Sequence, residues 1–161
     1  MTISMVNNTS KVIIAERSQA ELLAQLRKIS YHNSSSFRVT DRAAVDEYCA
    51  WTEKDDNGIV LPALYKHGEP IFTLRANIYF SLDELRANNT IFKQCPDGFV
   101  SLPVLDMTIV ATNPLYFNRG VLLALRYYMY LLHKHSVKSV TGATVKDSNI
   151  YYSLKNLDMN S

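Results

Sequence analysis

One predicted helix, FNRGVLLALRYYMYLLHKHSV at residues 117–137, limits the possible folds most strongly. Its polar side chains Arg119, Arg126 and His133 are seven residues apart, so they form one narrow stripe on a helix. Apolar and aromatic side chains cover most of the other surface, among them Leu122, Leu125, Tyr128, Met129 and Leu132. Because such a helix leaves little surface for water, we expect it to pack against a sheet.

The composition indicates one globular domain that covers residues 1–161. A chain of 161 residues with 47% hydrophobic and 20% charged residues is long enough to bury a core. A formal net charge of +2, with no run rich in Lys and Arg, gives nucleic acid little to bind. No segment reaches the ~18 consecutive apolar residues of a membrane span, and the N-terminus lacks a secretory pattern. We therefore expect a cytoplasmic protein with no membrane span and no nucleic-acid partner.

The cysteines and histidines indicate neither a disulfide framework nor a metal site. Cys49 and Cys95 are the only cysteines and fit no disulfide or zinc spacing, so two reduced thiols are expected. His133 and His135 are two residues apart, which turns them to different faces of a helix. Cationic groups there suit the C-terminal end of the helix dipole. We expect no metal and no bound cofactor.

The first half of the chain predicts a strand, two helices and a hairpin. The expected elements are a strand at 11–16, helices at 19–30 and 41–51, and hairpin strands at 59–66 and 71–80. Ser18 and Glu21 have the spacing of a capping box for the first helix. The inner faces of the two helices are expected to hold Leu22, Leu23, Leu26 and Ile29 in the first, and Ala44, Val45, Tyr48 and Cys49 in the second. DDNG at 55–58 reads as a turn.

The second half begins with an insertion that a minimal meander would not need. Residues 81–99 hold a short helix, capped by Ser81 and Glu84, and a loop. The expected elements after it are a strand at 100–112, the apolar helix, a strand at 137–145 and a short helix at 148–156. In the first of these strands Leu105, Met107 and Ile109 share one face, and Val104, Asp106, Thr108 and Val110 share the other.

This order of elements predicts a mixed α/β sheet with a cleft. A strand, a buried helix and a second strand form the crossover unit of a parallel pair, whereas the earlier hairpin is antiparallel. Neighbouring strands can separate where the two kinds of pairing meet, and ligands of open α/β sheets favour such places. The apolar helix would then lie behind this cleft.

The order resembles the GNAT acyltransferase fold. The insertion at 81–99 makes it most similar to the acyl-homoserine-lactone synthases and the long-chain N-acyl amino acid synthases. Asp46-Glu47-Tyr48 resembles the family's Asp-x-Tyr, GEPIFTLRA with Arg75 resembles its G-x-x-x-G-x-x-R-L strand, and DMTIV with Asp106 resembles its Glu-Leu-Ser-Arg-Phe strand. The resemblance implies a GNAT-like sheet with helices on both faces and a V-shaped cleft between the fourth and fifth strands.

The same resemblance implies an N-acyltransferase. It would move a fatty acyl chain from an acyl thioester, on acyl carrier protein or acyl-CoA, to a small amine such as an amino acid. Asp106 would be the base, Arg75 its partner, and Tyr152 the acid for the leaving sulfur. Asp46 and Tyr48 would bind the acceptor. An equally open interpretation makes Asp106 and Arg75 a structural ion pair that fixes strand register.

Two further groups of residues have assigned roles in this interpretation. The cleft for the acyl chain would be lined by Phe72, Leu74, Val110, Tyr127 and Tyr130. An acidic carrier protein would be steered by Arg119, Lys134, Arg27 and Lys28. These four cations can equally be ordinary solvated charges.

A different class of function also fits the sequence. NPLYFNRGVLLAL, after the fourth strand, lacks the glycines with which GNAT enzymes bind a pyrophosphate. Cys49 and Ile109 stand where the synthases have charged residues. The alternative is a degenerate, non-catalytic GNAT-fold protein that serves as a binding or assembly module. An uncovered edge on the strand 137–145 would also favour a partner there, either a second copy in a homodimer or the segment 1–10 folded back.

Overall fold

The computed structural model describes residues 11–32, 42–64 and 68–142, the side chains of 117–125 excepted. Its five-stranded sheet has the order β1-β2-β3-β4-β5. The strands are β1 (Lys11–Val12), β2 (Ile59–Leu64), β3 (Pro70–Tyr79), β4 (Val104–Thr112) and β5 (Ser139–Gly142). The first three pairings are antiparallel, and β4 pairs with β5 in parallel. The predicted mixed sheet is confirmed.

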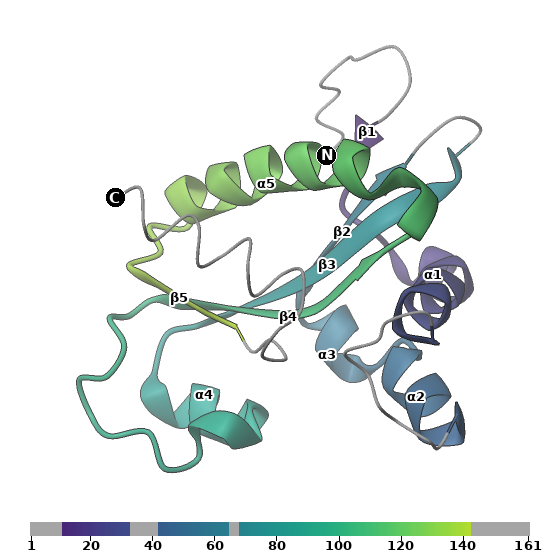
Figure 1. Cartoon of the computed structure of the whole chain (residues 1–161). Coiled ribbons are helices and arrows are strands. Elements are labelled where there is room, and N and C mark those ends of the chain that lie inside the picture. Colours follow the sequence, from purple (N-terminus) through teal and green to yellow (C-terminus); the bar gives the residue numbers. More distant parts are fainter. Residues whose placement is uncertain (1–10, 33–41, 65–67, 143–161) are drawn as a thin grey trace.

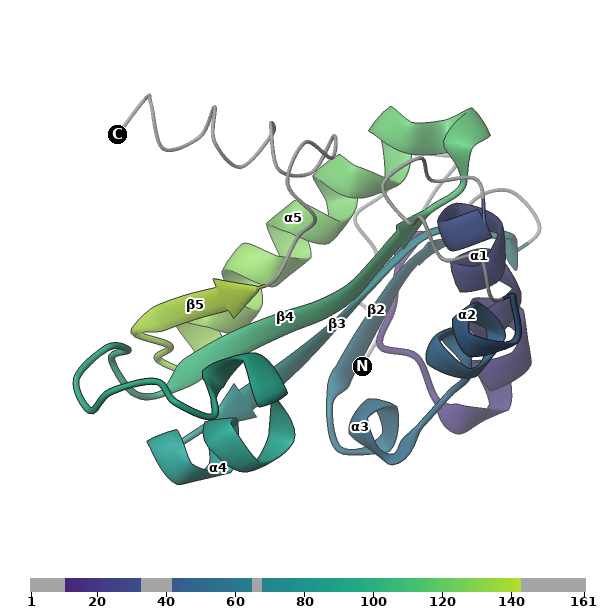
Figure 2. The same ribbon diagram turned by 60° about the horizontal axis from the view of Figure 1, so that its bottom comes forward.

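Helices cover both faces of this sheet. They are α1 (Ala20–His32), α2 (Arg42–Cys49), α3 (Glu53–Asp56), α4 (Leu82–Asn88) and α5 (Phe117–Lys134). The apolar helix α5 crosses one face, and α1 and α3 lie against the other, with α2 packed on α1 (Figure 1). Helix α4 belongs to the insertion between β3 and β4 and stands at the end of the sheet (Figure 2). No helix in the described part of the chain is long and apolar enough to span a membrane.

The core under α5 comes from alternate residues of the central strands. Leu61 and Ala63 on β2 pair with Leu74 and Phe72 on β3, so all four point to the same face. They pack with Tyr127 and Leu131 of α5 in one buried cluster. The prediction that the apolar helix packs on a sheet is therefore confirmed.

Helix α1 buries a different face from the predicted one. Leu23 and Leu26 are buried as expected, but Leu22 and Ile29 are exposed, and the fully buried Arg27 shares the inner face. The start of the helix also differs, because a 3-10 turn at Arg17–Gln19 precedes it. That turn places Ser18 inside itself, and the capping box forms between Glu16 and Gln19.

The insertion begins as predicted. The Ser81 side chain accepts a hydrogen bond from the Glu84 N–H at 3.2 Å, and the Glu84 carboxylate accepts one from the Phe80 N–H at 3.1 Å. The first bond uses a backbone donor that a helix start leaves unpaired, and the second joins Glu84 to the residue before the cap. The cap of Ser81 and Glu84 is confirmed.

A bulge interrupts β4 and changes which side chains share a face. Arg75 pairs with Thr108 and Leu74 pairs with Val110, so Ile109 is the extra residue, and its φ is 44°. A positive φ is unfavourable for a β-branched residue. Beyond the bulge Val110 lies on the face of Leu105 and Met107, so the predicted strict alternation is wrong from Ile109 onward.

Candidate functional site

Polar side chains gather on β3 and β4, on the face that α1 and α3 cover. Arg75 stands opposite Thr108, and Asn77 stands opposite Asp106. Arg75, Asn77 and Asp106 are all buried. The Arg75 guanidinium donates from Nε to the Thr108 hydroxyl at 2.9 Å. Four polar side chains next to the β4 bulge are unusual on a sheet face that helices cover.

The strongest charge interaction in this strip is centred on Asp55. Arg27 donates from Nη2 to Asp55 Oδ1 at 2.6 Å, and Arg75 Nη1 lies 3.4 Å from Asp55 Oδ2. The same Oδ2 accepts the Thr52 N–H at 2.8 Å, which closes the first turn of α3. Asp55 and Arg27 have fully buried side chains, and the Arg75 side chain is 7% exposed. Asp55 is therefore not simply part of a turn, because two guanidinium groups converge on it.

These contacts fix the charge state of Asp55. Burial alone would raise its pKa, but hydrogen bonds from Arg27 and the Thr52 N–H, with the charges of both arginines, lower the pKa below its ordinary value. One buried carboxylate thus faces two guanidinium groups among the described residues.

Two predictions fail at this cluster. Arg75 contacts Asp55 and Thr108, so the predicted ion pair between Arg75 and Asp106 is wrong. The reason is register, because the residue opposite Asp106 is Asn77. Arg27 is wrong as a carrier-binding residue, since a fully buried guanidinium cannot meet an acidic surface.

Asp106 has a different pair of partners. Its Oδ1 accepts the Thr141 hydroxyl of β5 at 2.9 Å, and its Oδ2 accepts the Asn89 side-chain N–H of the insertion at 2.9 Å. Asn89 in turn accepts the Ile91 N–H at 3.1 Å, which orients its amide so that the NH₂ group faces Asp106. Asp106 is 2% exposed. Its carboxylate therefore joins the insertion, β4 and β5.

The outer edge of β4 beyond the bulge contacts the last turn of α1. The Tyr31 hydroxyl donates to the Val110 carbonyl at 3.1 Å, and the Ser30 hydroxyl accepts the Thr112 N–H at 3.0 Å. Burial, followed by the neighbouring Tyr48, raises the pKa of Tyr31 above its ordinary value. The last described pair between β4 and β5 is Met107 with Gly142. From Thr108 onward, the described part of β5 supplies no partner for this edge.

The predicted acceptor residues lie on the outer part of α2. Asp46 contacts His32 Nε2 at 3.0 Å with a side chain that is 48% exposed, and the hydrogen bond from His32 lowers the pKa of Asp46. Tyr48 is 46% exposed and meets the Tyr31 ring edge to face at 5.6 Å. The predicted inward position of Tyr48 is wrong, although its ring lies beside a residue that contacts β4.

The predicted acyl-lining residues divide between core and edge. Phe72, Leu74 and Tyr127 are buried in the cluster under α5, on the opposite face of the sheet from Asp106. Val110 and Tyr130 are partly buried against that cluster. The Tyr127 and Tyr130 rings stack at 5.6 Å. Of these five, Val110 is the residue at the bulge.

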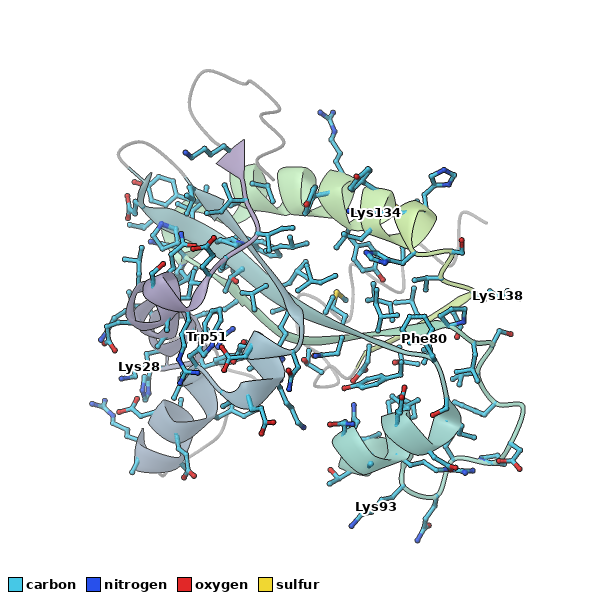
Figure 3. The ribbon with its side chains drawn as sticks, turned by 180° about the vertical axis from the view of Figure 1, so that it is seen from behind. Lys28, Trp51, Phe80, Lys93, Lys134 and Lys138 are labelled. Atoms are coloured by element: carbon cyan, nitrogen blue, oxygen red, sulfur yellow. The ribbon has the colours of Figure 1, made fainter. Side chains whose placement is uncertain are left out.

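The remaining predicted residues do not form one basic patch. Lys28 on α1 and Lys134 on α5 lie on opposite sides of the sheet (Figure 3). Lys134 Nζ lies 5.8 Å from the centre of the Tyr130 ring. The Arg119 side chain and Tyr152 lie outside the described residues, as does the predicted helix at 148–156.

Neither Cys49 nor a cluster of potential metal ligands forms a reactive site in the described part of the chain. Burial raises the pKa of the Cys49 thiol to about 11, so it stays protonated and is a poor nucleophile. Among the described residues, no group of three His, Cys, Asp or Glu side chains could hold a metal ion.

Several residues of this site were absent from the sequence interpretation. Asp55, Asn89 and Thr141 were not identified, nor were Ser30 and Tyr31. Thr52 lies three residues before Asp55, which is the spacing of a capping box, so the sequence does indicate a helix start there. The contacts of the other four join segments that are distant in sequence, and no local pattern reports them.

Comparison with known proteins supports the fold. No protein-family model and no curated protein matches the chain. Among solved structures, the aminoglycoside 6'-N-acetyltransferase AAC(6')-Ih from Acinetobacter baumannii matches with a TM-score of 0.58 and 13% identity, over 92% of this chain and 88% of that one.

Two further structures match over nearly the whole chain. The aminoglycoside N-acetyltransferase AAC(6')-Iy in complex with CoA gives a TM-score of 0.60 and 15% identity, over 96% of this chain and 90% of that one. A possible acetyltransferase from Clostridium difficile gives 0.59 and 10%, over 96% and 91%. At such identities the likeness concerns the fold. Together with the mixed five-stranded sheet and its helices on both faces, these neighbours show that the chain has the GNAT fold.

Proposed function

We propose that the protein is an N-acyltransferase, which moves an acyl group from a thioester to an amine. The observation that carries this proposal is the β4 bulge at Ile109. It lies two residues after Met107, the last β4 residue with a described β5 partner, and beside the buried strip of Arg75, Thr108 and Asp106. Strained backbone beside buried charged groups is typical of active sites. Structural neighbours of the same fold are N-acetyltransferases, one of them in complex with CoA.

The donor is proposed to lie along the outer edge of β4 beyond the bulge. The backbone groups of Val110 and Thr112 that face this edge can bind the amides of an extended chain, such as the arm shared by CoA and acyl carrier protein. The glycine-rich turn that would hold a pyrophosphate is absent after β4. A donor held mainly through its arm and a long acyl chain fits this chain better than one held through its pyrophosphate.

Asp106 is proposed as the base. The attacking amine must lose a proton as its nitrogen bonds to the thioester carbon, the tetrahedral oxyanion must be stabilised, and the departing thiolate must gain a proton. Asn89 and Thr141 both donate to Asp106 and fix the orientation of its carboxyl group, which as base would take the amine proton, directly or through one water. Arg75 contributes positive charge beside the bulge. Tyr152 stays a prediction as the proton donor for sulfur.

A non-catalytic binding module is the second candidate, and the burial of Asp106 favours it. Both oxygens of Asp106 have donors, and its exposure is only 2%. A carboxylate in that position can serve solely to join the insertion to the sheet. In this case the protein would bind an acyl thioester or a partner and release no thiol.

The test is an acyl-transfer assay with several donors. Purified protein receives acetyl-CoA, a long-chain acyl-CoA or an acylated carrier protein, together with a mixture of amino acids and other small amines. Free thiol is measured against time, and mass spectrometry identifies any new amide. The proposal expects thiol and amide in equal amounts with at least one donor. Binding of a thioester without thiol release would support the binding module instead.

A further inference from the structure

The backbone groups that Ser30 and Tyr31 contact belong to the outer edge of β4. The Asn113 N–H donates to the Ile71 carbonyl at 2.9 Å, so these two residues form a hydrogen-bonded pair across β3 and β4. Such pairs alternate along an antiparallel ladder. Thr112 and Val110, opposite Phe72 and Leu74, therefore turn their N–H and C=O groups away from β3.

The two hydroxyl groups reproduce the hydrogen bonds of a neighbouring strand. In a parallel pair, a residue that faces residue j of the next strand makes two hydrogen bonds to that strand. Its N–H donates to the carbonyl of residue j−1, and its carbonyl accepts from the N–H of residue j+1. Opposite Ala111, those groups are the Val110 carbonyl and the Thr112 N–H. Tyr31 supplies the donor to the first at 3.1 Å, and Ser30 supplies the acceptor for the second at 3.0 Å.

We propose that Ser30 and Tyr31 occupy the place of the acyl donor's amide arm on β4 and must leave it when the donor binds. This inference rests on the proposed function. Within the described residues, side chains of α1 satisfy the outward Val110 carbonyl and Thr112 N–H of β4. An extended chain bearing amides offers the same donor and acceptor, so the two occupants compete for the same atoms. The last turn of α1 thus acts as an internal competitor of the donor.

The position of Ser30 and Tyr31 at the end of α1 allows them to move away from β4. Ser30 and Tyr31 lie in the final turn of α1, beside the end of β4 (Figure 2). Helix ends open at lower cost than helix centres. The buried Leu23, Leu26 and Arg27 hold the earlier turns of α1 against the rest of the protein. The last turn can therefore shift while the helix stays in place.

Binding of CoA alone tests the inference, without knowledge of the acceptor. Tyr31→Phe and Ser30→Ala each remove one of the two hydrogen bonds with which α1 competes for β4. Each is expected to tighten CoA binding by about two- to tenfold in isothermal titration calorimetry. Tyr128→Phe is the matched control, because Tyr128 lies on α5 and packs against the core. It should leave the dissociation constant unchanged.

Hydrogen exchange of the unmodified protein gives a second readout that needs no variant. CoA should slow exchange at residues 108–112 and speed it at residues 29–32, because the α1 turn is displaced. Slower exchange in both segments, or unchanged or weaker binding by both variants, would show that the hydroxyls do not compete. No CoA binding by the unmodified protein, either variant or the control would instead overturn the proposed CoA-type donor, and this inference with it.

Discussion

A catalytic and a purely structural role of Asp106 predict different results for its substitution. Asp106→Asn is expected to abolish acyl transfer and keep the fold. The side-chain carbonyl of the introduced amide can still accept from Asn89, and the Thr141 hydroxyl can rotate to accept from the new NH₂ group. Rates of thiol release and urea unfolding, measured side by side, separate the two roles. A folded variant with unchanged activity would remove Asp106 from the mechanism.

Asp55 is expected to matter most for stability. Asp55→Asn leaves Arg27 and Arg75 without their buried carboxylate and should lower the free energy of unfolding by ~3–5 kcal/mol. The neighbouring Asp56→Asn is the control, since Asp56 pairs with an Arg17 side chain that is 75% exposed. Its loss should cost only ~0–1 kcal/mol in urea denaturation. Equal losses from the two variants would contradict the buried cluster.

The same carboxylate predicts how stability depends on pH. The folded pKa of Asp55 is lower than its ordinary value of ~3.9, so this group stabilises the fold fully above that pH. The contribution is lost as the pH falls from ~3.9 through the folded pKa. Asp55→Asn should therefore show a smaller decrease in unfolding free energy between pH 5 and pH 3 than the unmodified protein. An identical decrease would mean that Asp55 does not titrate with folding.

At the level of elements, the Asn89 side chain links the insertion to β4 through Asp106. Asn89→Ala removes the donor to Asp106, and Asn88→Ala removes only a bond to the Glu84 carbonyl on the surface. A hydrogen bond to a charged acceptor is worth ~1.5–3 kcal/mol, so Asn89→Ala should be clearly the more destabilising. It should also speed proteolysis within residues 81–99. Equal proteolysis of the two variants would show that other contacts hold the insertion.

Most elements of this fold could be predicted because their signals are local. Residues close together in the sequence determine each of three features: the periodicity of α5, the cap at Ser81 and the hairpin of β2 and β3. The bulge could not be predicted, since nothing in DMTIV marks Ile109 for a positive φ. The burial of Arg27 also depends on a partner, Asp55, that lies 28 residues away in the sequence.

The site was predicted less completely than the fold. Asp106 and Arg75 were both identified and both lie in the buried polar strip. Their mutual contact was wrong, because a strand register decides which side chains meet and a sequence does not state it. The contacts of Ser30 and Tyr31 with β4 join residues that are 82 and 79 positions apart in the sequence, and only the assembled sheet brings them together.

At the scale of the whole molecule, the proposed donor is a long-chain thioester. A long-chain acyl-CoA should raise the unfolding temperature more than acetyl-CoA does, because its chain adds buried apolar area at ~25 cal/mol per Å². Differential scanning fluorimetry with both donors at equal concentration measures this. Free fatty acid at the same concentration is the control for detergent-like effects. Equal protection by the two thioesters would argue against a site for a long acyl chain.

The most direct test of acyl transfer uses cells rather than a chosen substrate. Extracts of cells that express the unmodified protein, Asp106→Asn or no protein are compared by mass spectrometry, which needs no assumption about acceptor or acyl length. At least one acylated amine is expected to accumulate with the unmodified protein and to be absent from the other two extracts. Three indistinguishable extracts, with both proteins soluble and folded, would contradict an acyltransferase.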